Sequence, residues 1–306
     1  MLISDLEIVI KTAEFGSITA ASENLDIQVA RASAAIKRVE KQIGFELFIR
    51  STRKLRLSVA GENYIPQCIQ ALEILNNAQQ EEMINQGAIS GELRLTSSSD
   101  LGRNILMPWL DDLVTQHSQL KLKLVLSDQP LDFYRDSVDI ALRYGSPSDS
   151  NMYGFKICDV PRVLCASPSY LDKHALPVHP KDIADHNALC YQMNGVVHDT
   201  WKFTNKKKTY SIKVKGNRVS NDGDLVRKWC VAGKGLAFKS ILDISNDLLN
   251  RNIISIIPEY KPAPTELWLI CPSKQSINPL VRLLRDEITN NCHNLLKKLK
   301  DKGHIL

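Results

Sequence analysis

Apolar residues recur at helical spacing through the first sixty positions of the chain. A first helix is predicted by four residues that follow the i, i+3, i+4, i+7 pattern of one buried face, Leu6, Val9, Ile10 and Ala13. Gly16 can end this helix, and Ser17 can cap a second one that runs to Leu25. A tight turn then leads into a third helix over residues 28–42, which stops near Gly44. Two helices joined by so short a turn indicate a helix-turn-helix.

The stretch that follows, LFIRSTRKLRLS, has the pattern of a short hairpin. Residues 51–54 lie between two extended pieces, so the turn of this hairpin forms a basic wing. Residues 1–58 are therefore expected to form a small α-helical winged helix-turn-helix domain.

A long amphipathic helix is predicted next. Ser58 can cap it, and it continues without a break to about Gly87. Its apolar residues form one narrow stripe, made of Ile65, Cys68, Ile69, Leu72 and Leu75. So long a helix has too little local core to bury that stripe, which favours pairing with the same helix of a second chain over packing on its own domain. Residues 59–89 are expected to be a linker and dimerisation helix.

From Gly91 onward, strands and helices alternate. Strand-like runs are predicted at residues 92–97, 121–127, 138–143, 162–166, 188–192, 210–215, 235–239, 253–257 and 266–271. Helical patterns lie between several of them, at residues 101–114, 224–231 and 279–290. This alternation is typical of an α/β fold with mainly parallel sheets, arranged as one sheet or as two lobes.

The composition excludes several other classes of protein. Of the 306 residues, 43% are hydrophobic and 24% are charged, which is typical of a globular chain and not of a disordered, collagen-like or disulfide-stapled one. No run approaches the roughly 18 consecutive apolar residues of a membrane span. The N-terminal MLISDLEIVIK carries acids where a secretory signal carries bases. The expected location is the cytoplasm, with no membrane partner.

The distribution of charge points to a partner. The formal net charge is +5. Between Gln28 and Ala60 there are eight basic residues, Arg31, Lys37, Arg38, Lys41, Arg50, Arg53, Lys54 and Arg56, against two acids, Glu40 and Glu46. This local excess of six, eight minus two, is larger than the net charge of the whole chain. Such a density in one short segment favours a polyanionic partner.

On a helical wheel, the third helix has two unlike faces. The inner arc is apolar and consists of Ala32, Ile36, Val39 and Ile43. The opposite arc carries small and basic side chains, Ala30, Ala34, Lys37 and Lys41. Arg31 and Arg38 flank that outer arc, and Ser33 lies at its edge. A helix with an apolar inner face and a basic outer rim fits the major groove of double-stranded DNA.

The stretch GSITAASENLDIQVARASAAIKRVEKQIGFELFIRSTRKLRLSVAG resembles the DNA-binding region of the LysR-type transcriptional regulators. The residues that match the family pattern are Gly16, Ser17, Ala20, Ala21, Leu25, Ser33, Ile36, Glu40, Gly44, Leu47, Phe48, Arg50, Arg53 and Gly61. With the helical wheel, the resemblance gives the candidate DNA-binding residues Ser17, Ala30, Arg31, Ser33, Ala34, Lys37, Arg38, Arg50 and Arg53. The chain departs from the family pattern at Val29, Ala30 and Ala35. These departures affect which operator sequence is expected and not which fold is expected.

Downstream, VDIALRYG, LCASPSYLDKH and AGKGLAF resemble the effector-sensing half of the same family, although Lys234 interrupts a usually apolar Gly-x-Gly. The resemblance implies a periplasmic-binding-protein-like pair of α/β lobes with a ligand cleft between them, over residues 90–306. Lobe I takes about residues 90–162 and 267–295, and lobe II about 163–266. It also implies a homodimer or homotetramer that binds a double-stranded DNA operator and answers to a small-molecule effector, with RNA polymerase as a further partner.

The effector site is predicted where the strands of the sensor end. In open α/β sheets, ligands bind beyond the carboxyl ends of strands, where helix N-termini present unpaired N–H groups and a partial positive charge. The candidate residues at these ends are Ser97, Ser98, Ser99, Ser127, Asp128, Asn221 and Asp222, with Tyr191 as an aromatic wall. Hydroxyls and N–H groups favour a small carboxylate or another polar anion, and the two aspartates favour an amine or hydroxyl on it. The alternative is that these side chains only cap their helices.

No motif indicates an enzyme, since GxSxG, HExxH, GxxxxGK[ST] and GxGxxG at a strand end are all absent. No cofactor or metal is expected, although His174, His179 and His186 lie close in sequence. The seven cysteines form no CxxC pair. Two alternatives are a thiol-based redox-sensing regulator of the same fold, for which Cys158 and Cys165 are seven apart, and a cytoplasmic solute-binding protein, which the basic N-terminal segment disfavours.

Overall fold

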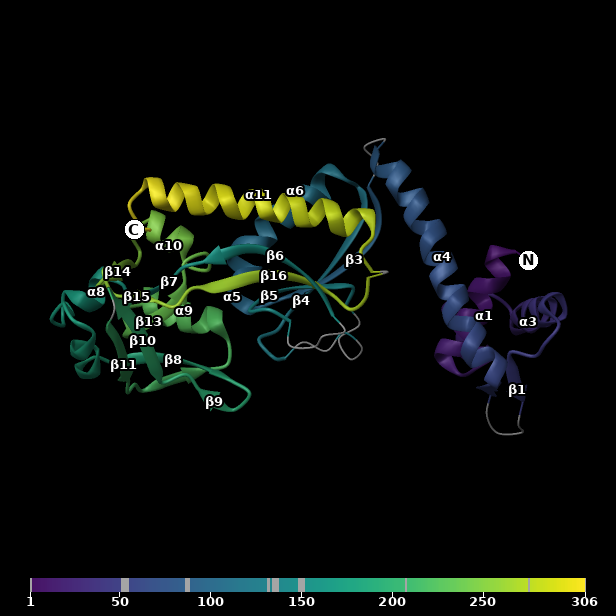
Figure 1. Ribbon diagram of the computed structural model, residues 1–306, viewed down its shortest axis with the longest axis horizontal. Helices are drawn as coiled ribbons and strands as arrows, with labels where there is room; N and C mark the ends of the chain where they lie inside the picture. Colours follow the sequence, from purple (N-terminus) through teal and green to yellow (C-terminus); the bar gives the residue numbers. More distant parts are fainter. Residues whose placement is uncertain are drawn as a thin grey trace. The chain divides into compact units, whose positions relative to one another are not determined.

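The computed structural model describes residues 2–50, 55–85, 89–130, 133, 138–147, 152–206, 208–274 and 276–305. The chain divides into two compact units, Met1–Glu82 and Met83–Leu306. The elements of both are labelled in Figure 1.

The N-terminal unit consists of helices and one antiparallel hairpin. Its elements in chain order are α1 (Ile3–Phe15), α2 (Ile18–Asn24), α3 (Val29–Ile43), β1 (Phe48–Arg50), β2 (Leu55–Leu57) and the start of α4 (Val59–Asn85). The predicted helix ends are confirmed. Gly16 and Gly44 have the left-handed φ values of 59° and 84° that end α1 and α3, and the Ser17 hydroxyl accepts the Ala20 N–H at 3.3 Å.

A small apolar core holds this unit together. Its buried members are Val9, Ile36, Val39, Leu47, Phe48 and Ile65. Glu40 of α3 positions the hairpin because its carboxylate accepts the N–H groups of Leu47 (2.8 Å) and Phe48 (3.3 Å). Gly61 lies against the Leu47 carbonyl, and a Cβ at this position would overlap it. Glycine is therefore required for α4 to begin so close to the hairpin.

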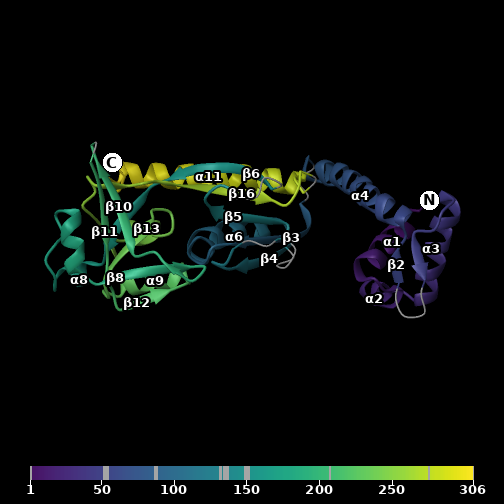
Figure 2. The ribbon, with the colours of Figure 1, turned by 60° about the horizontal axis from the view of Figure 1, so that its bottom comes forward.

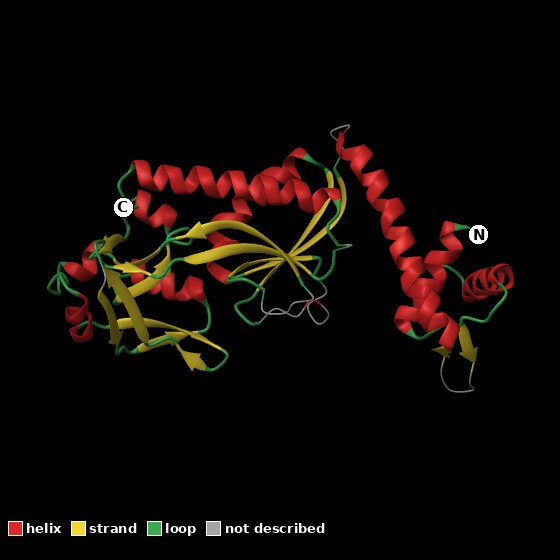
Figure 3. Ribbon diagram, viewed as in Figure 1, coloured by secondary structure: helices red, strands yellow, loops and turns green. Residues whose placement is uncertain are grey.

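The C-terminal unit contains two large sheets, seen among the yellow strands of Figure 3. The first, with its helices, is lobe I and has the order β4-β3-β5-β16-β6. Its strands are β3 (Ser90–Ser97), β4 (Gln119–Leu126), β5 (Ile140–Tyr144), β6 (Tyr153–Val160) and β16 (Thr265–Cys271). Its helices are α5 (Ser99–Leu101), η1 (Gly102–Leu106), α6 (Met107–Gln116) and α11 (Pro279–Asp301). Helix α11 runs beside β6 and β16 in Figures 1 and 2.

Lobe II is built on the second sheet, β12-β8-β13-β7-β14, with β9 paired to β8. Its strands are β7 (Arg162–Ala166), β8 (Ala188–Met193), β9 (Val196–Val197), β12 (Arg218–Ser220), β13 (Leu236–Ser240) and β14 (Ile254–Ile256). A small antiparallel sheet adds β10 (Thr200–Asn205), β11 (Lys208–Lys213) and β15 (Lys261–Pro262). Its helices are α8 (Pro168–Leu171), η2 (Pro180–Asp185), α9 (Gly223–Val231) and α10 (Ser245–Leu249).

The chain passes between the lobes twice. The first crossing is Pro161, between β6 and β7, and its carbonyl accepts the Ile241 N–H of lobe II at 2.9 Å. The second crossing is residues 263–264, between β15 and β16. One hydrophobic cluster includes buried residues of both lobes, such as Leu142 and Ala237. The two lobes therefore share a packed core.

The structure corrects three expectations. Along each main sheet two pairings are parallel and two are antiparallel, so the sheets are mixed and not mainly parallel. Strands β6, β9, β10, β12 and β15 were not predicted. Because β6 and β12 lie at sheet edges, their polar, half-exposed residues weaken the apolar pattern. Helix α11 continues to Asp301, past its predicted end at residue 290, because lysines on its exposed side dilute the stripe.

Candidate DNA-binding face and interlobe polar site

The outer face of α3 is the candidate surface for DNA. Ala32 is fully buried, and Ile36 and Val39 are 1% exposed, as the helical wheel predicts. The opposite arc is exposed to solvent and carries Ala30, Ala34, Lys37 and Lys41. Helix α3 is therefore anchored through its apolar side and presents small and basic side chains outward.

The residues beside this face have different surroundings. Arg31 is exposed and Ser33 is half-buried. The Arg38 guanidinium binds the buried Asp5 carboxylate of α1 through two bonds, Nε to Oδ2 (2.9 Å) and Nη2 to Oδ1 (2.6 Å). The hydrogen bond from Arg38 lowers the pKa of Asp5 although burial opposes it. This bidentate pair fixes the direction of the Arg38 side chain at the rim of α3.

Sequence reasoning missed Asp5, whose signal is an acid next to Leu6 on the apolar side of α1. Ser17 caps α2. Arg50 ends β1, but its side chain lies outside the described residues, and Arg53 lies outside them altogether.

Polar groups from both lobes meet where β3 and β4 end. The Asp128 carboxylate, which follows β4, accepts the Ser99 N–H at 2.7 Å and the Ser99 hydroxyl at 2.6 Å. It also accepts the Gly223 N–H of lobe II at 2.7 Å. The Ser99 hydroxyl lies 3.1 Å from an Asp222 carboxylate oxygen. The structure thus brings three of the candidate effector-binding residues together, namely Ser99, Asp128 and Asp222.

The first N–H groups of α9 are already paired. Gly223 donates to Asp128, Asp224 donates to the Ser99 hydroxyl (3.3 Å) and Leu225 donates to Asp222 (3.0 Å). The expectation of unpaired N–H groups at this helix start is therefore wrong. The physical reason is that side chains from both lobes accept these N–H groups.

Three candidates surround this group. Ser97 is fully buried, and the buried hydroxyls of Ser97 and Ser98 have no hydrogen-bond partner among the described residues. Tyr191 is half-buried on β8, and burial together with the nearby charge of Asp128 raises its pKa. Tyr191 therefore lies within electrostatic reach of this carboxylate.

The last two candidates lie at the rim. The Ser127 hydroxyl accepts the Gln129 N–H at 3.2 Å, and Asn221 is exposed. The Arg143 guanidinium, which was not predicted, donates to the Ser127 carbonyl and to the Thr96 hydroxyl (3.0 Å). It links the ends of β3 and β4 below the site.

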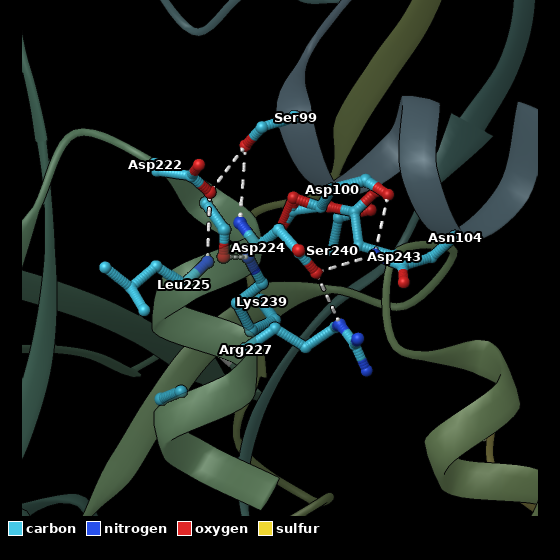
Figure 4. A network of polar contacts seen from close by, with 12 residues as sticks. Ser99, Asp100, Asn104, Asp222, Asp224, Leu225, Arg227, Lys239, Ser240 and Asp243 are labelled. Atoms are coloured by element: carbon cyan, nitrogen blue, oxygen red, sulfur yellow. Dashed lines mark hydrogen bonds and ion pairs between the residues drawn. The ribbon is translucent and has the colours of Figure 1, made fainter. Parts of the chain in front are cut away.

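Figure 4 shows a buried charge cluster that sequence reasoning missed. Lys239 of β13 pairs with Asp100 of lobe I and donates to the Gly223 carbonyl at 3.0 Å. Both charged side chains are buried, at 8% and 4% exposed. Burial lowers the pKa of Lys239, but the charges of Asp100 and Asp243 outweigh it and raise the pKa, so the ammonium stays charged. The signal for this pair is the lysine that interrupts the apolar run LAFKS.

Asp224, which is also labelled in Figure 4, forms a second polar link between the lobes. Its carboxylate accepts from Asn104 of lobe I (3.0 Å) and from Arg227 (3.0 Å), and the Lys228 ammonium lies 2.9 Å away. Burial raises the pKa of Asp224, but these hydrogen bonds outweigh it and lower the pKa to about 2. Arg103 of lobe I pairs with Asp222 at 3.2 Å.

Asp243 gives the lobe junction a pH dependence. Its carboxylate accepts the Tyr144 hydroxyl at 2.6 Å. Burial raises its pKa from 3.8 to about 8, with Asp100 adding to the effect and Lys239 opposing it. For an acid whose pKa is raised by folding, the stabilisation is complete below the unfolded value and is lost as the pH rises toward the folded one.

We therefore expect Asp243→Asn to gain stability relative to the wild type as the pH rises from about 5 to about 8, by at most about 1.4 kcal/mol per pH unit. Urea unfolding of both proteins at a series of pH values measures the difference. A difference that stayed constant across this range would contradict the raised pKa of Asp243.

The described residues contain no group of three or more His, Cys, Asp or Glu side chains that could hold a metal ion. All seven cysteines are buried free thiols. The Sγ atoms of Cys165 and Cys230 lie 3.9 Å apart, and this neighbour together with burial raises the pKa of Cys165. This raised pKa disfavours the thiolate of Cys165, whereas the hydrogen bond with Cys292 lowers the pKa of Cys158. Across the described ranges, no helix has the length and apolar character of a membrane span.

A winged helix-turn-helix unit followed by a two-lobed α/β unit defines a DNA-binding transcription regulator with an effector-sensing domain. Two family models match the chain, the bacterial regulatory helix-turn-helix protein of the lysR family over residues 3–62 and the LysR substrate binding domain over residues 86–293. The chain belongs to the LysR family of transcriptional regulators.

Relatives align over almost the whole chain. The chain is 28% identical to the regulator DmlR of Escherichia coli over 282 residues, 92% of each protein. It is 26% identical to the activator TtdR of Escherichia coli over 307 residues, 99% of this chain and 97% of that protein. The solved structure of full-length AphB, a Vibrio cholerae virulence activator, matches with a TM-score of 0.56 and 26% identity over 95% of this chain and 99% of that chain. CrgA of Neisseria meningitidis shares the fold, with a TM-score of 0.58 and 24% identity over 97% and 98% of the two chains.

Proposed function

We propose that this regulator binds an operator through α3 and is controlled by a small polar metabolite bound between its lobes. The observation that carries the proposal is the outer face of α3, where small and basic side chains are exposed on a helix whose other side is buried. Such a helix fits a major groove. Residues 1–58 are assigned to DNA binding, 59–89 to the linker helix and 90–306 to sensing. The site of action is the cytoplasm, where the operator lies.

Ala30 and Ala34 set the mode of base reading. Neither can make a hydrogen bond to a base edge, so the direct contact left to them is with thymine methyl groups. The operator is therefore expected to be rich in A·T pairs. Replacing thymine by uracil in a mapped operator removes only those methyl groups and is expected to weaken binding by roughly 1 kcal/mol or more. Titration of the two operators measures this, and equal affinities would refute methyl reading by Ala30 and Ala34.

The effector is proposed to bind at the strand ends that carry Ser97, Ser98 and Ser99. The unpartnered hydroxyls of Ser97 and Ser98 support this placement, because buried polar groups in proteins are normally paired. Tyr191 and Asn221 complete the proposed site.

A polar metabolite that raises the melting temperature of the wild type is expected to do so less in Ser98→Ala and Asn221→Ala. Operator binding without the metabolite is expected to be unchanged in both, since neither residue belongs to the N-terminal unit. Asn290→Ala, at an exposed position on α11, serves as the control and keeps the full shift. If a validated effector stabilised all variants equally, its site would lie elsewhere.

A homodimer or homotetramer is proposed through α4. Beyond the buried Ile65 and Cys68, the stripe of this helix exposes Ile69 (37%) and Leu75 (53%). Exposed apolar side chains on a long helix support its pairing with a second copy. RNA polymerase is a further proposed partner once the operator is bound.

A further inference from the structure

We infer that the Asp128 carboxylate occupies the position between the lobes where an anionic effector would bind. It accepts the hydrogen bonds that such an effector would need, and it holds the lobes together in the effector's place. This inference rests on the proposed effector site and concerns how that site is regulated.

The contacts of Asp128 are those of a bound carboxylate. Its two oxygens accept three hydrogen bonds of 2.6 to 2.7 Å, from the Ser99 N–H, the Ser99 hydroxyl and the Gly223 N–H. Hydrogen bonds to a charged acceptor are the short and strong ones. Two of the donors belong to lobe I and one starts α9 of lobe II, so the carboxylate joins the lobes as a ligand would.

The hydrogen-bond donors around the Asp128 carboxylate already have acceptors. The Ser99 hydroxyl has one hydrogen but two carboxylate neighbours, Asp128 at 2.6 Å and Asp222 at 3.1 Å, and it accepts the Asp224 N–H. The hydrogen goes to the nearer acceptor. The Asp222 carboxylate accepts hydrogen bonds from the Leu225 N–H and from Arg103 instead. A further carboxylate finds no free donor among these groups, so an anionic effector binds here only if it displaces Asp128.

The charged groups around Asp128 also disfavour the binding of a second anion. The nearby acids are Asp100, Asp128, Asp222 and Asp224, and the cations paired with them are Lys239, Arg103, Arg227 and Lys228. Each of these four cations is already paired, so an anion added beside the four acids must share a cation with one of them. The polar groups left over are the neutral hydroxyls of Ser97 and Ser98. An effector that leaves Asp128 in place would therefore bind through the hydroxyls of Ser97 and Ser98, each of which can donate one hydrogen bond and accept others.

Deleting the carboxylate tests the inference by chemical rescue. In the full chain, Asp128→Ala vacates the position and frees its donors, and we expect the melting temperature to fall by roughly 5–10 °C. Sodium formate, a carboxylate small enough for the vacated space, is expected to restore at least half of this loss in a saturable manner. Sodium chloride at the same ionic strength is expected to restore little, and formate is expected to leave the wild type unchanged relative to chloride.

Asp139→Ala is the matched control. The Asp139 carboxylate also lies in lobe I and accepts a backbone N–H, that of Arg94 at 3.0 Å, but it contacts no residue of lobe II in the described contacts. Formate is expected to act on this variant no more than chloride does. If Asp128→Ala does not fold, Asp128→Ser leaves similar space and gives the same test.

Formate that acted no better than chloride on the Asp128 variant, or equally well on Asp139→Ala or the wild type, would overturn the inference. The experiment needs no effector. Rescue by formate, with no metabolite found that stabilises the protein, would support the role of Asp128 and count against the proposed effector site. An effector mapped to this site, with no rescue by formate, would support the site and count against the role of Asp128.

Discussion

Replacing Lys239 with Met is expected to lower the free energy of unfolding of the C-terminal unit by about 3–5 kcal/mol. Met keeps the apolar stem of the side chain but leaves the buried Asp100 carboxylate without its cation. An uncompensated charge inside a protein costs far more than the net contribution of the pair. All four tryptophans lie in this unit, so their fluorescence during urea unfolding reports on it.

Two further variants make this result specific. Lys228→Met removes the partner at 2.9 Å from Asp224, but the Lys228 side chain is 61% exposed, and we expect a loss of only about 0–1 kcal/mol. Combining Lys239→Met with Asp100→Leu removes both charges and is expected to recover most of the loss. If Lys239→Met cost no more than Lys228→Met, the buried pair would not hold the lobes together.

Changing Ile69 and Leu72 to Lys is expected to convert the oligomer into monomers and to weaken operator binding by about 100-fold or more. The reason is that like charges would face each other along the stripe of α4, where Ile69 and Leu75 are exposed and Leu72 is half-buried. A monomer carries one winged unit and loses the second half-site of a palindrome. Sedimentation velocity and titration of the operator measure the two effects.

The matched control places the same charges on the polar side of α4. Gln67 and Gln70 are exposed and lie off the stripe, so Gln67→Lys with Gln70→Lys is expected to sediment as the wild type does. If the Ile69 and Leu72 variant also sedimented as the wild-type oligomer, α4 would not be the interface.

The N-terminal unit could be predicted closely because several of its helices carry their own boundary residues. Gly16 and Gly44 take the left-handed conformations that end α1 and α3. Ser17 caps α2, and the Ser58 hydroxyl accepts the Gly61 N–H at the start of α4. These signals act over three or four residues, so they can be read from a single sequence.

The candidate effector site could be predicted only in part. Strand ends placed Ser99, Asp128 and Asp222 near one another, since that rule depends on the local order of strand and helix. The partners across the lobes could not be predicted. Asp128 and Gly223 are 95 residues apart, and Lys239 and Asp100 are 139 residues apart. Such pairs depend on how two sheets pack, and no local pattern encodes this.

The two short crossings between the lobes decide how the sensor can move. Pro161 forms the first, and Pro262 and Pro264 border and end the second, so the backbone at both has a restricted φ. The ψ angles at these prolines stay variable, and the crossings are too short for much sliding, so the expected motion is rotation of one lobe against the other about a hinge, on a timescale on the order of microseconds to milliseconds. A metabolite signal would then be carried as a change of angle between two rigid bodies, with the fold of each lobe preserved.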